Sequence, residues 1–170
     1  MRQLLLILFL FTSHSPALAD GDGEAPFTTD LMVMDAGVMK PSRLDPETET
    51  IVVYFGASWC PPCRAFIPTL KEVAARWRQQ KRSVEVVFFS ADGSCDAMEE
   101  YIRRERMPWH FVSCRGRERM PAIAGLRGQP LPGVVVLDRQ GRVLDTSYQN
   151  HKKSDHESTL ARADAFTAPP

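Results

Sequence analysis

Two cysteines that stand two residues apart are the residues in this sequence best suited to chemistry. Cys60 and Cys63 lie in the segment Trp59-Cys60-Pro61-Pro62-Cys63, directly after the apolar run 51–55 and directly before a helical pattern. A helix N-terminus carries partial positive charge and free N–H groups, and both stabilise a thiolate, the reactive form of cysteine. The spacing lets the two sulfurs close into a small disulfide ring, and prolines suit the first turn of a helix.

The pattern of apolar residues predicts strands that alternate with helices around this pair. Strands are expected at 31–34, 38–39, 51–55, 84–91, 110–112, 133–137 and 142–144. Helices are expected after the cysteines (ending at 79–83, with a kink at Pro68), at 96–106, within 115–128, and from a capping box at 154–157 toward Phe166. This order predicts an α/β domain with a mixed, mainly parallel sheet, helices on both of its faces and an antiparallel C-terminal hairpin.

The charge balance excludes some classes of partner. The 170 residues include 21 Lys and Arg and 21 Asp and Glu, so the formal net charge is zero. This balance gives no support to binding of nucleic acid or of an anionic membrane surface. The length suits one domain.

The first residues are typical of a secretory signal peptide. Arg2 supplies a positive charge, residues 4–11 are apolar without interruption, and Ala17-Leu18-Ala19 is a cleavage site of small residues. We therefore expect a signal peptide at 1–19 and one domain at 20–170, with a loose leader at 20–30 and a tail at 167–170. The alternative is an uncleaved N-terminal anchor. Export predicts an oxidising compartment, with a bacterial periplasm as our first choice.

Three landmarks together carry a resemblance to a known fold. They are the Trp-Cys-x-x-Cys segment after a buried strand, a proline eight residues after Cys60 (Pro68), and Leu131-Pro132 before a later strand. In this order and spacing they resemble the thioredoxin fold, over roughly residues 31–145. Residues 54–70 are similar to the tryparedoxin and nucleoredoxin branch and to secreted TlpA-like reductases, and residues 84–92 and 107–109 are again similar to the tryparedoxin branch.

The resemblance implies a role for each matching position. Cys60 would be the exposed nucleophile that forms a mixed disulfide with a substrate, and Cys63 the buried resolving thiol. Pro132 would follow a cis peptide bond and pack against the cysteine pair. The main chain of Leu131 would pair with an extended substrate segment, and Trp59 would form an apolar wall beside Cys60.

One position departs from the resemblance. Ordinary thioredoxins place a buried aspartate six residues before the first cysteine, where this sequence has Tyr54. Another group is then needed to accept the proton of Cys63. Asp92 is the candidate, because it ends the neighbouring strand at the edge of the sheet that carries the cysteines, as in the tryparedoxin branch.

Two further cysteines follow the ends of two strands expected to be neighbours. Cys95 and Cys114 would meet near the same edge, and in an oxidising compartment we favour a structural disulfide. Two free thiols, or a second redox pair that relays electrons to Cys60 and Cys63, are the alternatives. Zinc-site spacing is absent, since only one Cys-x-x-Cys occurs, so no metal is expected.

These observations predict an exported thiol–disulfide oxidoreductase that acts on protein cysteines, as a reductase and without a metal or organic cofactor. Its partners would be proteins with disulfides or thiols and a membrane electron donor, and we expect a monomer. The alternatives are a disulfide oxidase or isomerase, and a client-binding module of thioredoxin fold in which the cysteine pair acts as a redox-gated latch.

Overall fold

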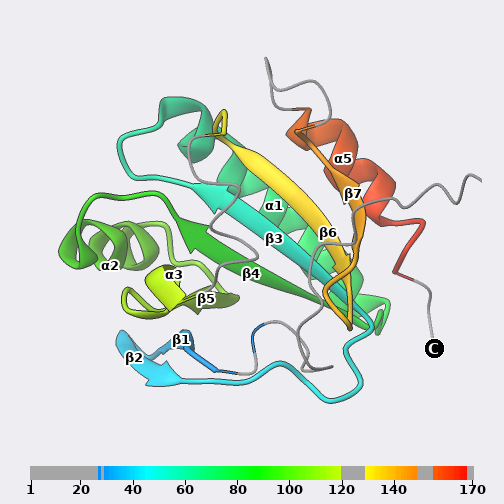
Figure 1. The fold of residues 1–170 in the computed structure, drawn as a ribbon, viewed down its shortest axis with the longest axis horizontal. Helices are drawn as coiled ribbons and strands as arrows, with labels where there is room; N and C mark the ends of the chain where they lie inside the picture. Colours follow the sequence, from blue (N-terminus) through cyan, green and yellow to red (C-terminus); the bar gives the residue numbers. More distant parts are fainter. Residues whose placement is uncertain (1–26, 28, 120–128, 149–154, 168–170) are drawn as a thin grey trace, which may run out of the picture.

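The computed structural model describes residues 27, 29–119, 129–148 and 155–167 (Figure 1). The expected signal peptide at 1–19, most of the leader, and residues 168–170 of the tail lie outside the described residues. So do Ser154 of the expected capping box and Pro121 in the region of the expected short helix. In the part of the chain that the structure describes, no helix is both long and apolar enough to cross a membrane.

A sheet of seven strands runs through the structure in the order β2-β1-β5-β4-β3-β6-β7. The strands are β1 (Leu31–Asp35), β2 (Val38–Pro41), β3 (Thr50–Gly56), β4 (Val84–Ser90), β5 (His110–Val112), β6 (Gly133–Asp138) and β7 (Val143–Thr146). The buried strand β3 lies between β4 and β6, so the loop after β3 is held in the middle of one edge.

The sheet is mixed, but the expectation of a mainly parallel sheet was wrong. Among the described strands, β3 pairs in parallel with β4, and β4 with β5. The other four neighbouring pairs, β1/β2, β1/β5, β3/β6 and β6/β7, are antiparallel. A parallel neighbour requires a crossover that carries the chain back to the opposite edge. Strand β6 instead starts beside the end of β3, with Gly133 opposite Phe55, and therefore runs in the opposite direction.

Four helices accompany the sheet in the described residues. They are α1 (Pro61–Gln79), α2 (Cys95–Arg104), α3 (Gly116–Arg119) and α5 (His156–Ala163). Helix α2 begins one residue earlier than expected, because the Ser94 side chain accepts the N–H of Ala97 and caps it. The expected capping box does not open α5. Its N-cap is Asp155, whose carboxylate makes no capping bond and lies 3.7 Å from Arg162 instead.

The three longer helices of the described residues pack on one face of the sheet. The expectation of helices on both faces stays a prediction, because residues 120–128 of the helix expected within 115–128 lie outside the described residues. Side chains from α1, α2 and α5 form one apolar cluster with Tyr54, Phe88 and Val134, and α1 runs behind the sheet in Figure 1. The opposite face is covered in the described residues by loop and strand side chains, including Phe27 and Tyr148. Because successive residues of β3 point to opposite faces, this strand is buried on both sides.

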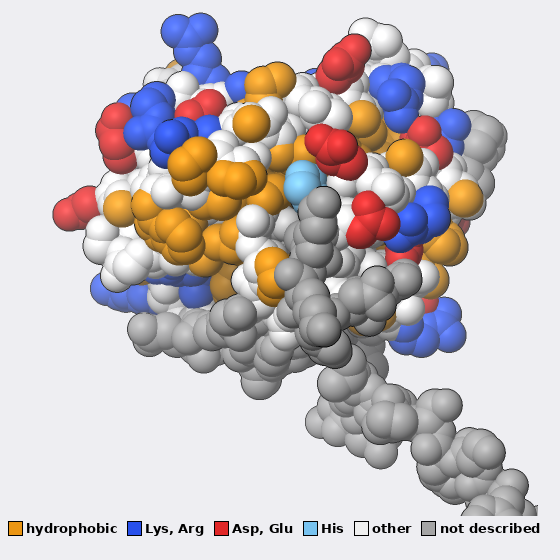
Figure 2. All heavy atoms as spheres, turned by 90° about the horizontal axis from the view of Figure 1, so that it is seen from above, with side chains coloured by type: hydrophobic (Ala, Val, Ile, Leu, Met, Phe, Trp, Pro, Cys, Tyr) orange, Lys and Arg blue, Asp and Glu red, His pale blue; other side chains and the backbone are white. Residues whose placement is uncertain are grey.

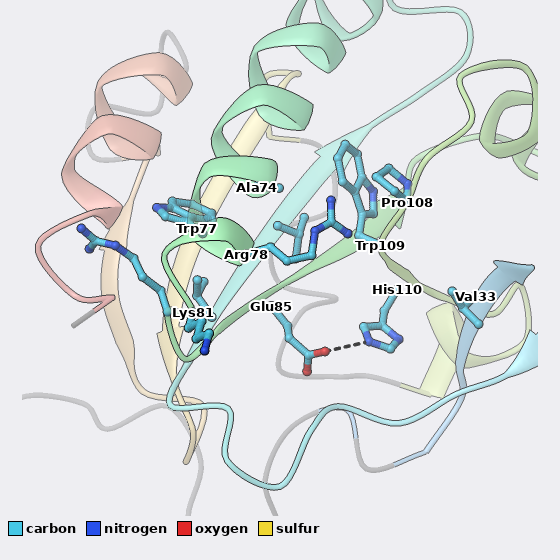
Figure 3. Close-up of a pocket in the computed structure, with 12 residues that line it drawn as sticks. Val33, Ala74, Trp77, Arg78, Lys81, Glu85, Pro108, Trp109 and His110 are labelled. Atoms are coloured by element: carbon cyan, nitrogen blue, oxygen red, sulfur yellow. Dashed lines mark hydrogen bonds and ion pairs between the residues drawn. The ribbon is translucent and has the colours of Figure 1, made fainter. Parts of the chain in front are cut away.

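A polar cluster lies at the far end of α1 from the cysteines. Here a hollow of about 390 Å³ is lined by Trp77, Arg78, Trp109 and His110 among others, and Figure 3 shows His110 turned toward Glu85. The Glu85 carboxylate lies 3.1 Å from His110 Nε2 and accepts hydrogen bonds from the Thr48 hydroxyl (2.8 Å) and the Asp45 N–H (2.9 Å). Glu85 therefore attaches the connection between β2 and β3 to the sheet.

The pKa of Glu85 predicts a pH-dependent contribution to stability. Burial works to raise this pKa, but the hydrogen bonds from His110, Thr48 and the Asp45 N–H outweigh it and hold it below its usual value. Because the pKa of Glu85 is lower in the folded protein than in the unfolded chain, its carboxylate stabilises the fold at pH values above the ordinary pKa of about 4.3. This contribution is lost as the pH falls through the pKa of the folded protein. We expect Glu85→Gln to cost about 1–2 kcal/mol at pH 7 and clearly less at pH 3, in urea denaturation.

Glu49→Gln is the matched control for this prediction, because Glu49 is exposed and lies in the connection between β2 and β3 that Glu85 attaches to the sheet. It should change stability little at either pH. An equal cost of Glu85→Gln at pH 3 and pH 7 would contradict the assigned role of the carboxylate.

Candidate redox site at the start of helix α1

Cys60 and Cys63 form a disulfide across the first turn of α1, with their Cα atoms 5.2 Å apart. Cys60 is the N-cap residue, and its sulfur accepts the N–H of Cys63 at 3.2 Å. Cys60 is 4% exposed in the disulfide form, so the expectation of an exposed Cys60 was wrong. Pro61 and Pro62 occupy the first helical positions and have no N–H to offer. The Cys63 N–H and the helix dipole would stabilise a Cys60 thiolate after reduction.

The buried carboxylate of Asp92 holds the loop that leads to Cys60. Asp92 is 5% exposed, and its Oδ1 accepts hydrogen bonds from the Ser58 N–H (2.9 Å) and the Ser58 hydroxyl (2.6 Å). Its Oδ2 accepts the hydroxyl of Ser90 at 2.8 Å. On the other side, the guanidinium of Arg64 donates to the Ser58 carbonyl at 2.8 Å. Ser58 is thus held from two directions, two residues before the first cysteine.

The segment before β6 forms the opposite wall of the site. The Leu131–Pro132 peptide bond is cis, which is the geometry that the resemblance implies. Leu131 packs against Ala57, Cys60 and Cys63, so the cysteine pair and the cis peptide segment are in direct contact. The Leu131 main chain makes no hydrogen bond to the other described residues, which leaves it available to an added strand.

A hollow of about 760 Å³ opens beside the disulfide, lined by Trp59, Cys60, Asp92, Cys114, Arg117 and Leu131 among others. Trp59 is 63% exposed, which is high for a side chain of its size. Seen from above, hydrophobic side chains gather on the left of the molecule, toward the end where α1 begins (Figure 2). This combination suits a site that receives part of another protein.

Cys95 and Cys114 form a second disulfide close to the first. Cys95 is the first residue of α2, and Cys114 follows β5, with Cα atoms 5.5 Å apart. Arg117 Nη2 lies 3.2 Å from the Cys114 sulfur, and its Nη1 donates to the carbonyl oxygens of Asp92 (2.8 Å) and Ser90 (3.1 Å). Among the described residues, no group of three His, Cys, Asp or Glu side chains could hold a metal ion.

Comparison with known proteins places this geometry in a family. A family model described as thioredoxin-like matches residues 48–143, which is more than half of the chain. The chain belongs to the thioredoxin-like family. Nucleoredoxin from Bos taurus is 36% identical over 99 residues, which cover 58% of this chain and 22% of that protein. Probable nucleoredoxin 3 from Oryza sativa subsp. japonica is 30% identical over 117 residues, which cover 67% of this chain and 24% of that protein. The matches thus span about a quarter of these relatives' length.

Solved structures of small thioredoxin-like proteins are similar to this chain over most of their own length. Tryparedoxin I from Crithidia fasciculata has a TM-score of 0.59 at 27% identity, covering 71% of this chain and 82% of that one. Thioredoxin from Wuchereria bancrofti also has a TM-score of 0.59, at 26% identity, and the match covers 88% of this chain and 100% of that one. The chain therefore has the thioredoxin fold, with its Cys-x-x-Cys pair at the start of a helix.

Tyr54 stands at the position of the buried aspartate of ordinary thioredoxins. It cannot accept the proton of Cys63 as a carboxylate would. Its hydroxyl donates to the carbonyl oxygen of Cys63 at 3.2 Å, which supports the first turn of α1 from below. Burial raises the pKa of Tyr54 far above its ordinary value, so the phenol stays neutral. The hydroxyl fits because residue 56 is glycine, since a Cβ there would collide with it.

The structure thus places all the predicted site residues around one edge of the sheet. The hollow is lined by Trp59, Cys60, Pro61, Pro62, Asp92 and Leu131, and Pro132, which follows Leu131, is buried. Sequence reasoning missed Ser58, Ser90 and Arg117. Arg117 stands in the region of the expected short helix, where nothing marks it as a site residue, and nothing in the local sequence marks the two serines as partners of Asp92.

Replacement of Asp92 tests both its anchoring role and its predicted role as proton acceptor. In Asp92→Asn, an amide NH2 would face a hydroxyl or N–H that needs an acceptor, so we expect a loss of about 1–3 kcal/mol in unfolding free energy. If Asp92 also takes the proton of Cys63, the resolving step should slow on the order of 100-fold, and its pH profile should change.

Ser58→Ala is the matched control, because it removes one hydrogen bond of Asp92 and leaves the carboxylate in place. Stopped-flow measurement of mixed-disulfide resolution compares the two variants. If both slow the step equally and leave its pH profile unaltered, Asp92 only positions the loop.

Proposed function

We propose that this protein is an exported thiol–disulfide oxidoreductase that exchanges the Cys60–Cys63 pair with protein cysteines, in the reductive direction. The observation that carries the proposal is the contact of the cysteine pair with the cis Leu131–Pro132 segment beside an open hollow. This arrangement supplies a nucleophilic sulfur and a main-chain edge for substrate in one place. The thioredoxin-like family membership supports the same reaction class.

The first step joins substrate and enzyme. The Cys60 thiolate attacks one sulfur of a substrate disulfide, forms a Cys60–substrate disulfide and releases the other substrate sulfur as a thiolate. The Cys63 N–H and the helix dipole favour the thiolate form of Cys60. An extended substrate segment would pair with the Leu131 main chain while the exposed Trp59 covers it from the other side.

The second step releases the reduced substrate. Cys63 loses its proton and attacks the Cys60 sulfur, which closes the Cys60–Cys63 disulfide and expels the second substrate thiolate. Asp92 is the predicted proton acceptor. Each cycle passes two electrons to the substrate, so a dithiol donor must reduce the pair again. In an oxidising compartment we propose a membrane protein for this task.

The prolines between the cysteines support the reductive direction. A dithiol whose thiolate is strongly stabilised is a strong oxidant, because its reduced form is favoured. Pro61 and Pro62 remove two helix N–H groups, and the sulfur of Cys60 receives one N–H bond, from Cys63. The guanidinium of Arg64 is engaged by the Ser58 carbonyl. We therefore expect the Cys60 thiolate of the reduced protein to receive few stabilising contacts.

The reduction potential of the Cys60–Cys63 pair tests the direction. We expect a value near that of thioredoxin, about −270 mV, in defined dithiol buffers with Cys95→Ser/Cys114→Ser as the background. A value near about −120 mV, typical of a strong oxidant, would reverse the direction and favour a disulfide oxidase or isomerase.

A Cys60→Ser variant in the same series separates catalysis from client binding. We expect it to lose all turnover of a protein disulfide. Retention of the protein's cellular role by this variant would favour a redox-gated client-binding module instead.

Export rests on the first 19 residues. The positive Arg2, the apolar run 4–11 and the Ala-x-Ala site support cleavage after Ala19 and residence in a bacterial periplasm. Expression of the full chain in a bacterium with a periplasm, followed by fractionation and mass spectrometry, tests this proposal. We expect a periplasmic product that begins at Asp20. A cytoplasmic product that retains residues 1–19 would overturn it.

A further inference from the structure

The second disulfide has features that an inert structural bridge does not need. Cys95 is an exposed residue, and Cys114 is partly buried in the wall of the hollow that also contains Cys60. By contrast, Cys60 and Cys63 are 4% and 0% exposed. The more accessible of the two disulfides is therefore Cys95–Cys114, and its exposed residue is Cys95.

Arg117 provides a fixed positive charge at the other sulfur. Its Nη2 lies 3.2 Å from the Cys114 sulfur, within hydrogen-bond reach. Its Nη1 is held by the carbonyl oxygens of Ser90 and Asp92, which orients the guanidinium plane. A guanidinium in this position lowers the free energy of a Cys114 thiolate, and a stabilised thiolate is a good leaving group in disulfide exchange.

Helix α2 adds a second stabilising element at Cys95. This helix has ten residues, Cys95 is its first, and the Ser94 side chain caps the N–H of Ala97 at 3.2 Å. The partial positive charge of the helix N-terminus therefore lies at Cys95. Each sulfur of the bridge thus has its own stabilising group in the thiolate form, Arg117 for Cys114 and the helix for Cys95.

We propose that Cys95–Cys114 is a second redox-active disulfide, which exchanges electrons with dithiols that approach from solvent. A thiolate of the incoming dithiol attacks the sulfur of the exposed residue Cys95, and Cys114 leaves as a thiolate beside Arg117. The second thiol of the partner then loses its proton and attacks the partner's first sulfur, which is joined to Cys95 in the mixed disulfide. This attack releases Cys95 as a thiolate. The partner leaves as a disulfide, two electrons remain on Cys95 and Cys114, and a disulfide partner reverses the sequence.

The position of Cys114 links this pair to the first site without requiring direct exchange between them. Cys114 and Cys60 line one hollow, and Arg117 contacts both the Cys114 sulfur and the main chain of Asp92. Reduction of the second pair therefore changes the wall against which a substrate of Cys60 would lie. The proposal does not depend on the direction of electron flow through Cys60 and Cys63.

Redox titration of the folded full chain tests the proposal. In a Cys60→Ser/Cys63→Ser background, the protein is equilibrated in graded mixtures of reduced and oxidised dithiothreitol, quenched with an alkylating reagent and analysed by mass spectrometry. We expect Cys95 and Cys114 to become alkylated together while the circular dichroism spectrum stays that of the folded protein. A bridge that opens only when the protein unfolds is structural, and that outcome would overturn the proposal.

Substitution of Arg117 tests its effect on the redox equilibrium of the Cys95–Cys114 pair, which would not change if Arg117 only supported the fold. We expect Arg117→Gln to disfavour the reduced pair about tenfold, which corresponds to about 30 mV. It should also raise the pH midpoint of Cys114 thiolate formation, followed by absorbance at 240 nm in a Cys95→Ser background. Arg117→Lys should retain most of both effects, and Arg115→Gln, at an exposed position two residues away, should change neither. Equal titrations for Arg117→Gln and the parent would contradict the assigned role.

Discussion

The hydrogen bonds of Asp92 are the constraint on which both cysteine pairs depend. Its buried carboxylate fixes Ser58, and through Ser58 the loop that ends at Cys60. Its main-chain carbonyl fixes Arg117, which lies against Cys114. A buried carboxylate is costly unless its oxygens are satisfied, and Ser58 and Ser90 satisfy them here. One residue just after β4 therefore sets the positions of groups on two other segments, the loop before α1 and helix α3.

The sheet makes this arrangement possible because its central strands end together. Strands β3 and β4 are parallel and in register from Thr50 opposite Val84 to Gly56 opposite Ser90, so Ser58 and Asp92 emerge side by side. Strand β6 runs antiparallel to β3, and its first residue lies at the same edge. The cis Leu131–Pro132 segment therefore reaches the cysteine pair directly, without a further connection.

Much of the fold followed from patterns of hydrophobic residues. The stripe after Cys63 predicted α1, whose buried residues Phe66, Ile67, Leu70 and Trp77 face the sheet. The apolar runs at 51–55 and 84–91 predicted the strands β3 and β4 with errors of one residue at their ends. Strand direction was predicted less well. The alternation of strands and helices favoured a mainly parallel sheet, because local periodicity does not record whether a connection crosses the sheet or turns back.

The sequence by itself determined the Cys60–Cys63 pair and the start of the helix that carries it. Both depend on residues within a few positions of one another, whose spacing sets which side chains meet in one helical turn. Only the tertiary structure decided that Asp92 holds Ser58, 34 residues away, and that Arg117 lies on Cys114 while its other nitrogen reaches the end of β4. These contacts join segments that the order of strands in the sheet brings together. That order is set by packing of the whole chain, which no local pattern of residues contains.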